Sequence, residues 1–256
     1  MNHLYDLLTD ERPSRRMYGV AVGTVRELRD PLGLGRVRVT FPWVAADDED
    51  AVVIDENDRR AHSYWARVAT LMAGGGRGAY FVPDVGEEVL VAFEHGELDR
   101  PVIIGGLWYK DAKPPVEMDE GGENHIRGIY TRSKHKIELN DSSDKSSILI
   151  QDSTGNKRIL IDTVNNKMEI TVRDDIVISA GGNITITAGG KLKLEGNSID
   201  VRADLECKVE AGTALNVKGA TEATVQSTTK AQVTGPIVSI KGSGMAEIQG
   251  GLVKIN

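Results

Sequence analysis

The side chains that could carry out chemistry in this chain are scattered, and none lies in the spacing of a known catalytic or ligand-binding site. The acidic run at residues 47–50 could hold a cation, but it lacks the ligand spacing of an EF-hand loop. The run Gly-Gly-Gly-Arg-Gly at 74–78 resembles a phosphate cradle, yet no Lys-Ser or Lys-Thr follows it. His95 precedes a glycine and has no evident acid–base partner. We interpret these features as a solvated loop, a turn between strands and an exposed turn residue.

The remaining candidates also favour a structural role. The single cysteine, Cys207, excludes an intramolecular disulfide, and its place among alternating apolar residues predicts a small apolar filler. No serine lies in a Gly-x-Ser-x-Gly motif. Trp43, Trp65 and Trp108 lie in or beside predicted strands, where a core or subunit-interface position is favoured over a sugar platform. We therefore expect no enzyme activity, no cofactor and no metal site.

Composition restricts the partners and the compartment. The formal net charge of −7 disfavours nucleic acid or an anionic membrane as the main partner. No apolar run approaches the length of a membrane-spanning helix, and the first ten residues lack the apolar region of a signal peptide. We expect cytoplasmic assembly without a signal peptide. With only 3 Phe residues and 28 Gly residues, the chain is poorly supplied for an ordinary globular core.

The last third of the chain carries a short repeat. Pairs of apolar residues separated by one residue recur every seven or eight positions from Ile176 to the C-terminus. This alternation is the spacing of a β-strand, and the residues between the pairs are mostly Gly, Asn, Asp, Ser and Thr, which favour turns. Each repeat is therefore predicted to be one short strand and one turn.

A strand of this length cannot bury its apolar side within one chain. Single-chain solenoids use longer coils or calcium-binding Gly-Gly-x-Gly-x-Asp loops, and the repeat here matches neither. Several identical chains wound around a shared core remain, and three chains closing a triangular prism are the economical version. We predict a homotrimer. Its predicted core residues are Ile176, Ile178, Ile184, Ile186, Leu192, Leu194, Ile199, Val201, Val209, Leu215, Val217, Val225, Val233, Ile240 and Ile248.

The first part of the chain is predicted to form a different β-structure. Residues 1–16 are polar and are expected to be an N-terminal arm. Residues 17–110 contain short strand signals separated by glycine-rich turns, which predicts a small closed barrel of OB type. The expected strands are 18–29, 36–41, 66–71, 88–93 and 102–107.

Three segments follow the predicted barrel. Residues 111–135 include a stretch rich in Pro, Gly and acidic residues and are expected to be a linker or neck. Residues 136–174 carry a looser repeat with longer turns, which we interpret as the wide beginning of the β-helix. Residues 175–256 form the regular octads. The predicted fold is all-β, with an OB barrel followed by an intertwined, triple-stranded trimeric β-helix.

Four segments of the predicted barrel carry a resemblance to a known family. In order and spacing they resemble the OB domain of contractile-injection spikes, which include the VgrG proteins of type VI secretion and the phage baseplate assembly protein V spikes. The resemblance covers roughly residues 17–110 and leads directly into the repeat. The segments are 36–43, 63–68, 83–93 and 96–107.

This resemblance implies a structural machine part. VgrG proteins usually carry a large N-terminal hub domain, and only about sixteen residues precede the barrel here, so a separate hub protein is expected at the OB end. No lysozyme-like insertion separates barrel and repeat, so cell-wall hydrolysis is not implied. All five histidines lie upstream of the octads, so the iron-binding His-x-His needle of many short phage spikes is not expected.

The C-terminus resembles the blunt end of VgrG proteins, which a separate PAAR-repeat protein caps. The residues expected to dock such a tip protein are Gly250, Gly251, Leu252, Val253, Lys254, Ile255 and Asn256. The function implied is that of a trimeric central spike, connected to tube and sheath components, which punctures a target envelope through transient membrane contact. The device could be a phage tail baseplate, a type VI system or a phage-like extracellular particle.

Two other functions remain open. The barrel could bind a glycan or an oligonucleotide and the β-helix could be a stalk, although basic and aromatic residues do not alternate as single-strand binding requires. The chain could also be a trimeric tail depolymerase. Such an enzyme needs a groove with paired carboxylates on a broad repeat face, and octads are too narrow to build one.

Overall fold

A computed structural model describes residues 16–45, 60–62, 64–118 and 120–255, and side chains are not described for residues 43–45 and 60–62. Residues 1–15 of the predicted arm at 1–16, the acidic run at 47–50 and Asn256 lie outside the described residues. The described elements are β-strands apart from one short 3-10 helix, η1 (Glu94–Gly96), so the all-β prediction is confirmed. The chain divides into two units, residues 1–179 and 180–256.

The first sheet contains six strands in the order β3-β2-β1-β7-β8-β4. Neighbouring strands are antiparallel except β4 and β8, which run parallel. A separate hairpin is formed by β5 (Ala73–Gly74) and β6 (Arg77–Gly78), so the glycine-rich run is a turn between strands, as predicted. The six strands are β1 (Val20–Glu27), β2 (Arg38–Ala45), β3 (Arg60–His62), β4 (Arg67–Val68), β7 (Glu88–Phe93) and β8 (Pro101–Leu107).

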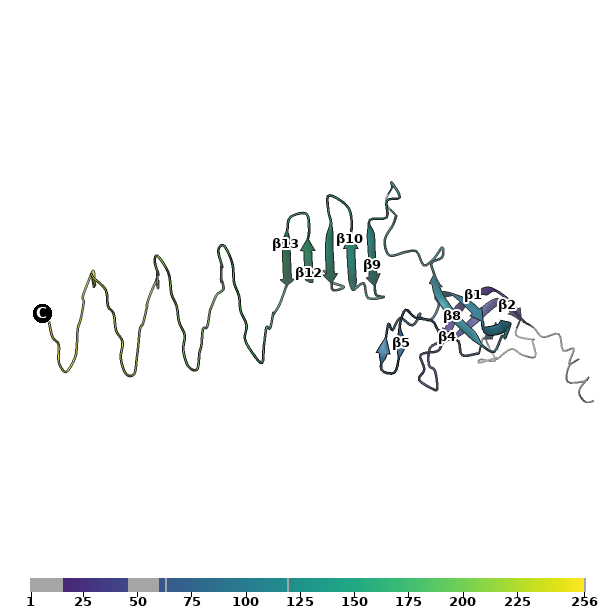
Figure 1. The fold of residues 1–256 in the computed structure, drawn as a ribbon, viewed down its shortest axis with the longest axis horizontal. Helices are drawn as coiled ribbons and strands as arrows, with labels where there is room; N and C mark the ends of the chain where they lie inside the picture. The colour runs from purple at the N-terminus through teal and green to yellow at the C-terminus, as the bar shows by residue number, and fades with distance from the viewer. Residues whose placement is uncertain (1–15, 46–59, 63, 119, 256) are drawn as a thin grey trace, which may run out of the picture. The chain divides into compact units, whose positions relative to one another are not determined.

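The six-stranded sheet curls until its two sides meet. Val37, just before β2, and Ala66, just before β4, exchange two backbone hydrogen bonds of 3.0 and 2.8 Å. This contact joins β2 to the strand at the far side of the sheet, so the sheet closes into a barrel (Figure 1). Alternate residues along the strands point inward and form the core. These core residues are Ala21, Val25, Val37, Val39, Phe41, Ala66, Val89, Val91, Phe93 and Ile103.

The turn between β1 and β2 is organised by Asp30. Its carboxylate accepts hydrogen bonds from the backbone N–H groups of Leu32 and Leu34 at 3.0 and 2.9 Å. The same carboxylate forms a bidentate pair with the Arg36 guanidinium, at 3.0 Å from Nε and 2.7 Å from Nη2. Gly33 and Gly35 have φ values of 63° and 69°, a region that favours glycine. Hydrogen bonding from Arg36, and then from the turn amides, holds the pKa of Asp30 well below its usual range.

We expect Asp30→Asn to lower the melting temperature of the barrel near neutral pH, because the amide cannot replace the charged bidentate acceptor. A carboxyl group with a depressed folded-state pKa stabilises the fold above its unfolded pKa of about 4 and loses this contribution as pH falls further. The difference between wild type and variant should therefore be full between about pH 5 and 7 and shrink below about pH 4. Thermal unfolding across this range measures it. Asp99→Asn, at an exposed position, is the control and should show no such dependence.

Candidate assembly surface

The second sheet is an antiparallel meander in which each strand pairs with the next along the chain, in the order β13-β12-β11-β10-β9 (Figure 1). The register is continuous across all four strand pairs. Three longer turns, at residues 131–135, 141–146 and 152–156, leave room for these hairpins. The strands are β9 (Ile126–Tyr130), β10 (Lys136–Asn140), β11 (Ser147–Gln151), β12 (Lys157–Asp162) and β13 (Lys167–Val172).

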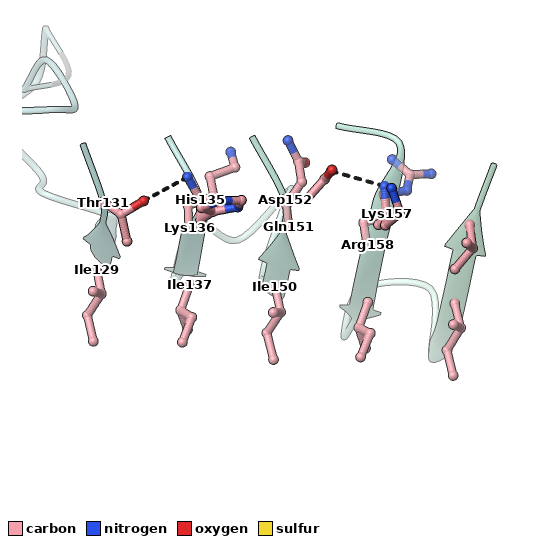
Figure 2. Close-up of a pocket in the computed structure, with 13 residues that line it drawn as sticks. Ile129, Thr131, His135, Lys136, Ile137, Ile150, Gln151, Asp152, Lys157 and Arg158 are labelled. Carbon is pink, nitrogen blue, oxygen red and sulfur yellow. Dashed lines mark hydrogen bonds between the residues drawn. The ribbon is translucent and has the colours of Figure 1, made fainter. Parts of the chain in front are cut away.

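One face of this sheet carries two apolar rows that run across the strands, together called the apolar band. The register places one isoleucine from every strand in the central row. Figure 2 shows Ile129, Ile137 and Ile150 of this row projecting in the same direction from neighbouring strands. The central row is Ile129, Ile137, Ile150, Ile159 and Ile170, and the second row is Leu139, Ile148, Ile161 and Met168, ending at Arg127 on β9.

The apolar band is largely exposed in the single chain. Ile150 is 47% exposed, Ile170 58% and Met168 62%, because no other element of the described chain packs on this face. A shallow pocket that lies along the central row is lined mainly by these isoleucines and the residues at one end of their strands. Burial of apolar surface is worth about 25 cal/mol per Å². A continuous exposed band of this kind therefore marks an interaction surface.

Polar residues border the band at the strand ends shown in Figure 2. Thr131 Oγ1 accepts a hydrogen bond from the His135 backbone N–H at 3.1 Å, and Asp152 Oδ1 accepts one from the Lys157 N–H at 3.1 Å. His135 Nδ1 accepts from the backbone N–H of Ser153 at 3.1 Å, so the proton of the neutral imidazole resides on Nε2. Hydrogen bonding from the Thr154 hydroxyl, and then from backbone amides, lowers the pKa of Asp152.

The opposite face of the sheet carries mainly polar and charged side chains, with Leu149 and Leu160 between Glu138 and Glu169. Tyr130 donates to Glu138 Oε2 at 2.8 Å, and Lys136 pairs with the same carboxylate at 3.2 Å. Burial, followed by the Glu138 hydrogen bond, raises the pKa of Tyr130 to about 12. Glu169 pairs with both Arg158 and Lys167, and the Lys167 hydrogen bond is the main cause of its lowered pKa. The polar face is thus typical of a sheet surface in contact with solvent, and the apolar band is typical of a surface that packs in a core.

The segment after β13 differs in its hydrogen bonding. Between residues 173 and 255 the structure contains no backbone–backbone hydrogen bond and no strand. The chain runs extended in a regular wave, and its bends are seven or eight residues apart (Figure 1). Each limb between two bends holds one apolar pair of the repeat. The bends lie at residues 173–174, 181–182, 189–190, 197, 204–205, 212–213, 220–221, 228–229, 236, 243–244 and 251–252.

Every residue of 173–255 is exposed, and none is shielded to the degree of a core side chain. The predicted core residues therefore do not contact one another to form a core in the single chain. Ile184 is 55% exposed, Ile186 68% and Val225 90%. Among the predicted tip residues, Leu252 is 77% and Ile255 86% exposed. Cys207 is also exposed. The extended backbone thus has neither burial nor backbone hydrogen-bond partners within the described chain.

The tryptophans of the barrel differ in environment. Trp65 is half-buried, and the guanidinium carbons of Arg36 and Arg38 lie 5.7 and 4.6 Å from its ring centroid. Trp108 is 71% exposed, so it is not a core residue in the single chain. His95 lies in η1 with a φ of 56°, in agreement with its interpretation as an exposed turn residue.

The sequence did not predict the strand β9, which falls within the expected linker at residues 111–135. The available signal was weak, because Ile126 and Ile129 are three residues apart and lie on opposite faces of the strand. In the structure Gly128 allows close backbone approach, since a Cβ there would lie 2.7 Å from the Ile137 carbonyl oxygen. The apolar band therefore begins one strand earlier than the repeat indicated.

The described part of the chain shows neither a metal site nor a membrane-spanning helix. No cluster of three or more His, Cys, Asp or Glu side chains has the geometry of a metal site. Within the same residues, no helix is long and apolar enough to span a membrane. The apolar band and the repeat are thus the strongest candidate site.

Comparison with known proteins identifies the barrel. Residues 21–108 match the family described as the type VI secretion system/phage-baseplate injector OB domain. The barrel is therefore an OB domain of the class found in contractile injectors. Over about half of its length the chain is also similar to VgrG spike proteins of type VI secretion systems. The resemblance noted from residues 36–107 is confirmed by these matches.

Three curated relatives illustrate this similarity. The type VI secretion system spike protein VgrG1a of Pseudomonas aeruginosa is 29% identical over 147 residues, which is 57% of this chain and 20% of that protein. VgrG3 of Vibrio cholerae, also a spike protein, is 27% identical over 127 residues, 50% of this chain and 11% of the relative. The actin cross-linking toxin VgrG1 of Vibrio cholerae is 26% identical over 127 residues, 50% of this chain and 10% of the toxin. The chain thus spans a fifth or less of the length of these relatives.

Proposed function

We propose that this chain is the central spike of a contractile injection machine and works as a homotrimer. The observation that carries the proposal is exposed apolar surface in both units: no described part of the chain covers the apolar band of β9–β13, and the apolar pairs of the repeat are exposed as well. In the repeat the backbone also has no backbone hydrogen-bond partner within the described chain. Only pairing with other chains satisfies both requirements at once.

Three copies are the smallest number that encloses a core with walls of this kind. Two copies of the sheet packed face to face would bury the apolar band, but the narrow repeat limbs would still have unpaired backbone edges. Three limbs around an axis can pair edge to edge and direct their apolar pairs inward. The similarity to the injector OB domain and to VgrG spike proteins supports the same arrangement.

The proposed mechanism is mechanical. The OB barrel docks on a separate hub protein connected to the tube and sheath, and the β-helix transmits the thrust of contraction to the target envelope. A shaft with interchain hydrogen bonds along its whole length has few weak points under compression. A PAAR-repeat protein would cover the open end at residues 250–256, where Leu252 and Ile255 are exposed. We assign no catalytic step to the chain.

Light scattering of the purified full chain tests this proposal. We expect a mass three times the 27.7 kDa of one chain, retained after gentle heating. A stable species of 27.7 kDa would show that the repeat closes on itself or remains extended, and the spike assignment would be abandoned. A dimer would contradict the prism and leave the repeat limbs without an explanation.

A further inference from the structure

The sheet β9–β13 has two kinds of boundary. Its edge strands, β9 and β13, continue in sequence into the preceding and following segments. Its other two boundaries are made of strand ends and turns. If three such sheets form the walls of the proposed prism, successive strands follow the prism axis, so neighbouring walls meet at their turn edges. This step rests on the proposed trimer.

We call the boundary with the turns 131–135 and 152–156 the first turn edge. The boundary with the turns 141–146 and 163–166 is the second turn edge. The register assigns the strand ends to these edges: Tyr130, Lys136, Gln151 and Arg158 to the first, and Ile126, Asn140, Ser147 and Asp162 to the second. Each edge therefore presents two complete hairpin turns.

The two edges differ in charge. Residues 130–136 and 151–158 of the first turn edge contain five basic side chains and one acidic side chain. Residues 140–147 and 162–167 of the second contain three acidic and two basic side chains. The basic residues of the first edge are Arg132, Lys134, Lys136, Lys157 and Arg158, and the acidic residues of the second are Asp141, Asp144 and Asp162.

Some of these charges are already paired within the chain. Arg132 pairs with Asp84, Arg158 with Glu169 and Asp141 with Arg127. Lys134 and Asp144 form no ion pair within the described part of the chain, and both are exposed. Opposite charges are thus available on opposite edges of the same sheet.

The positions of the turns along the sheet also allow contact between the two edges of neighbouring copies. The turn 141–146 joins β10 to β11, so it lies midway between the turns β9–β10 and β11–β12 of the other edge. Copies related by a pure threefold rotation stand at the same height. The acidic turn of one copy would therefore fall between the two basic turns of the next, about one strand spacing of 4.8 Å from each.

We propose that the first turn edge of each chain contacts the second turn edge of a second copy, with the turn carrying Asp144 held between Lys134 and Lys157. The contact is heterologous, and its repetition around the threefold axis closes the ring. The charges select one edge pairing, because two first edges or two second edges placed together would repel each other. The contact is exposed to solvent at the corners of the prism and is weakened by salt.

Charge reversal in the full-length chain tests the contact. We expect Lys134→Glu combined with Lys157→Glu to lower the melting temperature of the trimer by several degrees and to slow reassembly after denaturation at low salt. High salt should reduce the difference from wild type. Adding Ser143→Lys and Asp144→Lys to the same chain reverses the second edge as well and should restore melting and reassembly.

The matched control is Lys110→Glu combined with Lys113→Glu, at exposed positions outside both sheets. This control changes the net charge by the same amount as the Lys134→Glu, Lys157→Glu variant and should leave reassembly unchanged. If wild type is trimeric but the edge variant behaves like this control, or the fourfold variant does not recover, the proposed contact is wrong and the trimer stands. If wild type is not trimeric, the proposed function fails first and the contact fails with it.

Discussion

Ile186→Asp is expected to abolish trimer assembly. In the single chain Ile186 is 68% exposed, so a charge there would cost a monomer little. In the proposed β-helix the same side chain lies beside the threefold axis, where three unpaired carboxylates would meet in an apolar core. An uncompensated buried charge costs about 3–5 kcal/mol, and here the cost applies to each chain. The expected product is a monomer or a non-specific aggregate, measured by light scattering and sedimentation velocity.

Thr185→Asp is the matched control for this variant. Thr185 precedes Ile186 on the same limb, and strand alternation directs its side chain to the opposite side. The control adds the same charge to an equally exposed part of the chain and should assemble normally. Equal behaviour of the two variants, with unchanged melting, would show that the apolar pairs do not form the core.

Ile170→Asp is the second variant with a large expected effect. Ile170 lies in the central row of the apolar band and is 58% exposed in the single chain. Because the row would face the interior of the prism, we expect loss of the trimer or a melting temperature lower by 10 °C or more, on the order of 3 kcal/mol per chain. Thermal unfolding monitored by circular dichroism, together with the solution mass, measures both outcomes.

The neighbouring Thr171 provides the comparison. It lies on the opposite face of β13 and is also exposed. Thr171→Asp should therefore assemble with nearly wild-type stability. A monomeric protein has no reason to distinguish these two exposed positions, whereas an inward-facing band distinguishes them strongly. Similar tolerance of both substitutions would mean that the band is a solvent-exposed surface.

Much of the barrel was predictable because its signals are local. The strand signal at residues 88–93 predicted a strand, and β7 has the same bounds. The turn around Asp30 was indicated by its Pro and Gly residues. The strand β3 was not predicted, because it is a three-residue strand whose pairing with β2 depends on barrel closure. Such pairing is set by tertiary contacts, which a local pattern does not contain.

The candidate site was predictable in its periodicity but not in its hydrogen bonding. Both the sheet and the repeat contain apolar pairs, as at Ile148 and Ile150 or at Ile184 and Ile186. In the sheet the turns are long enough for hairpins, so each strand pairs with its neighbour in the same chain. In the octads the limbs follow each other too closely, and the described chain makes no such pairs. The pattern of side chains alone does not indicate which chain supplies the hydrogen bonds.

The regular spacing of the bends has a consequence for how the length of this protein can change. Residues 183–190 comprise one limb and the bend that follows it, and their removal would connect one Gly-Gly bend directly to Lys191 and the pair Leu192 and Leu194. Every remaining pair would keep its side. Steps of seven residues, as from Leu192 to Ile199, occur in the same repeat. Whole repeats can therefore be added or removed, so length is a quantity that evolution can adjust without redesigning the cross-section.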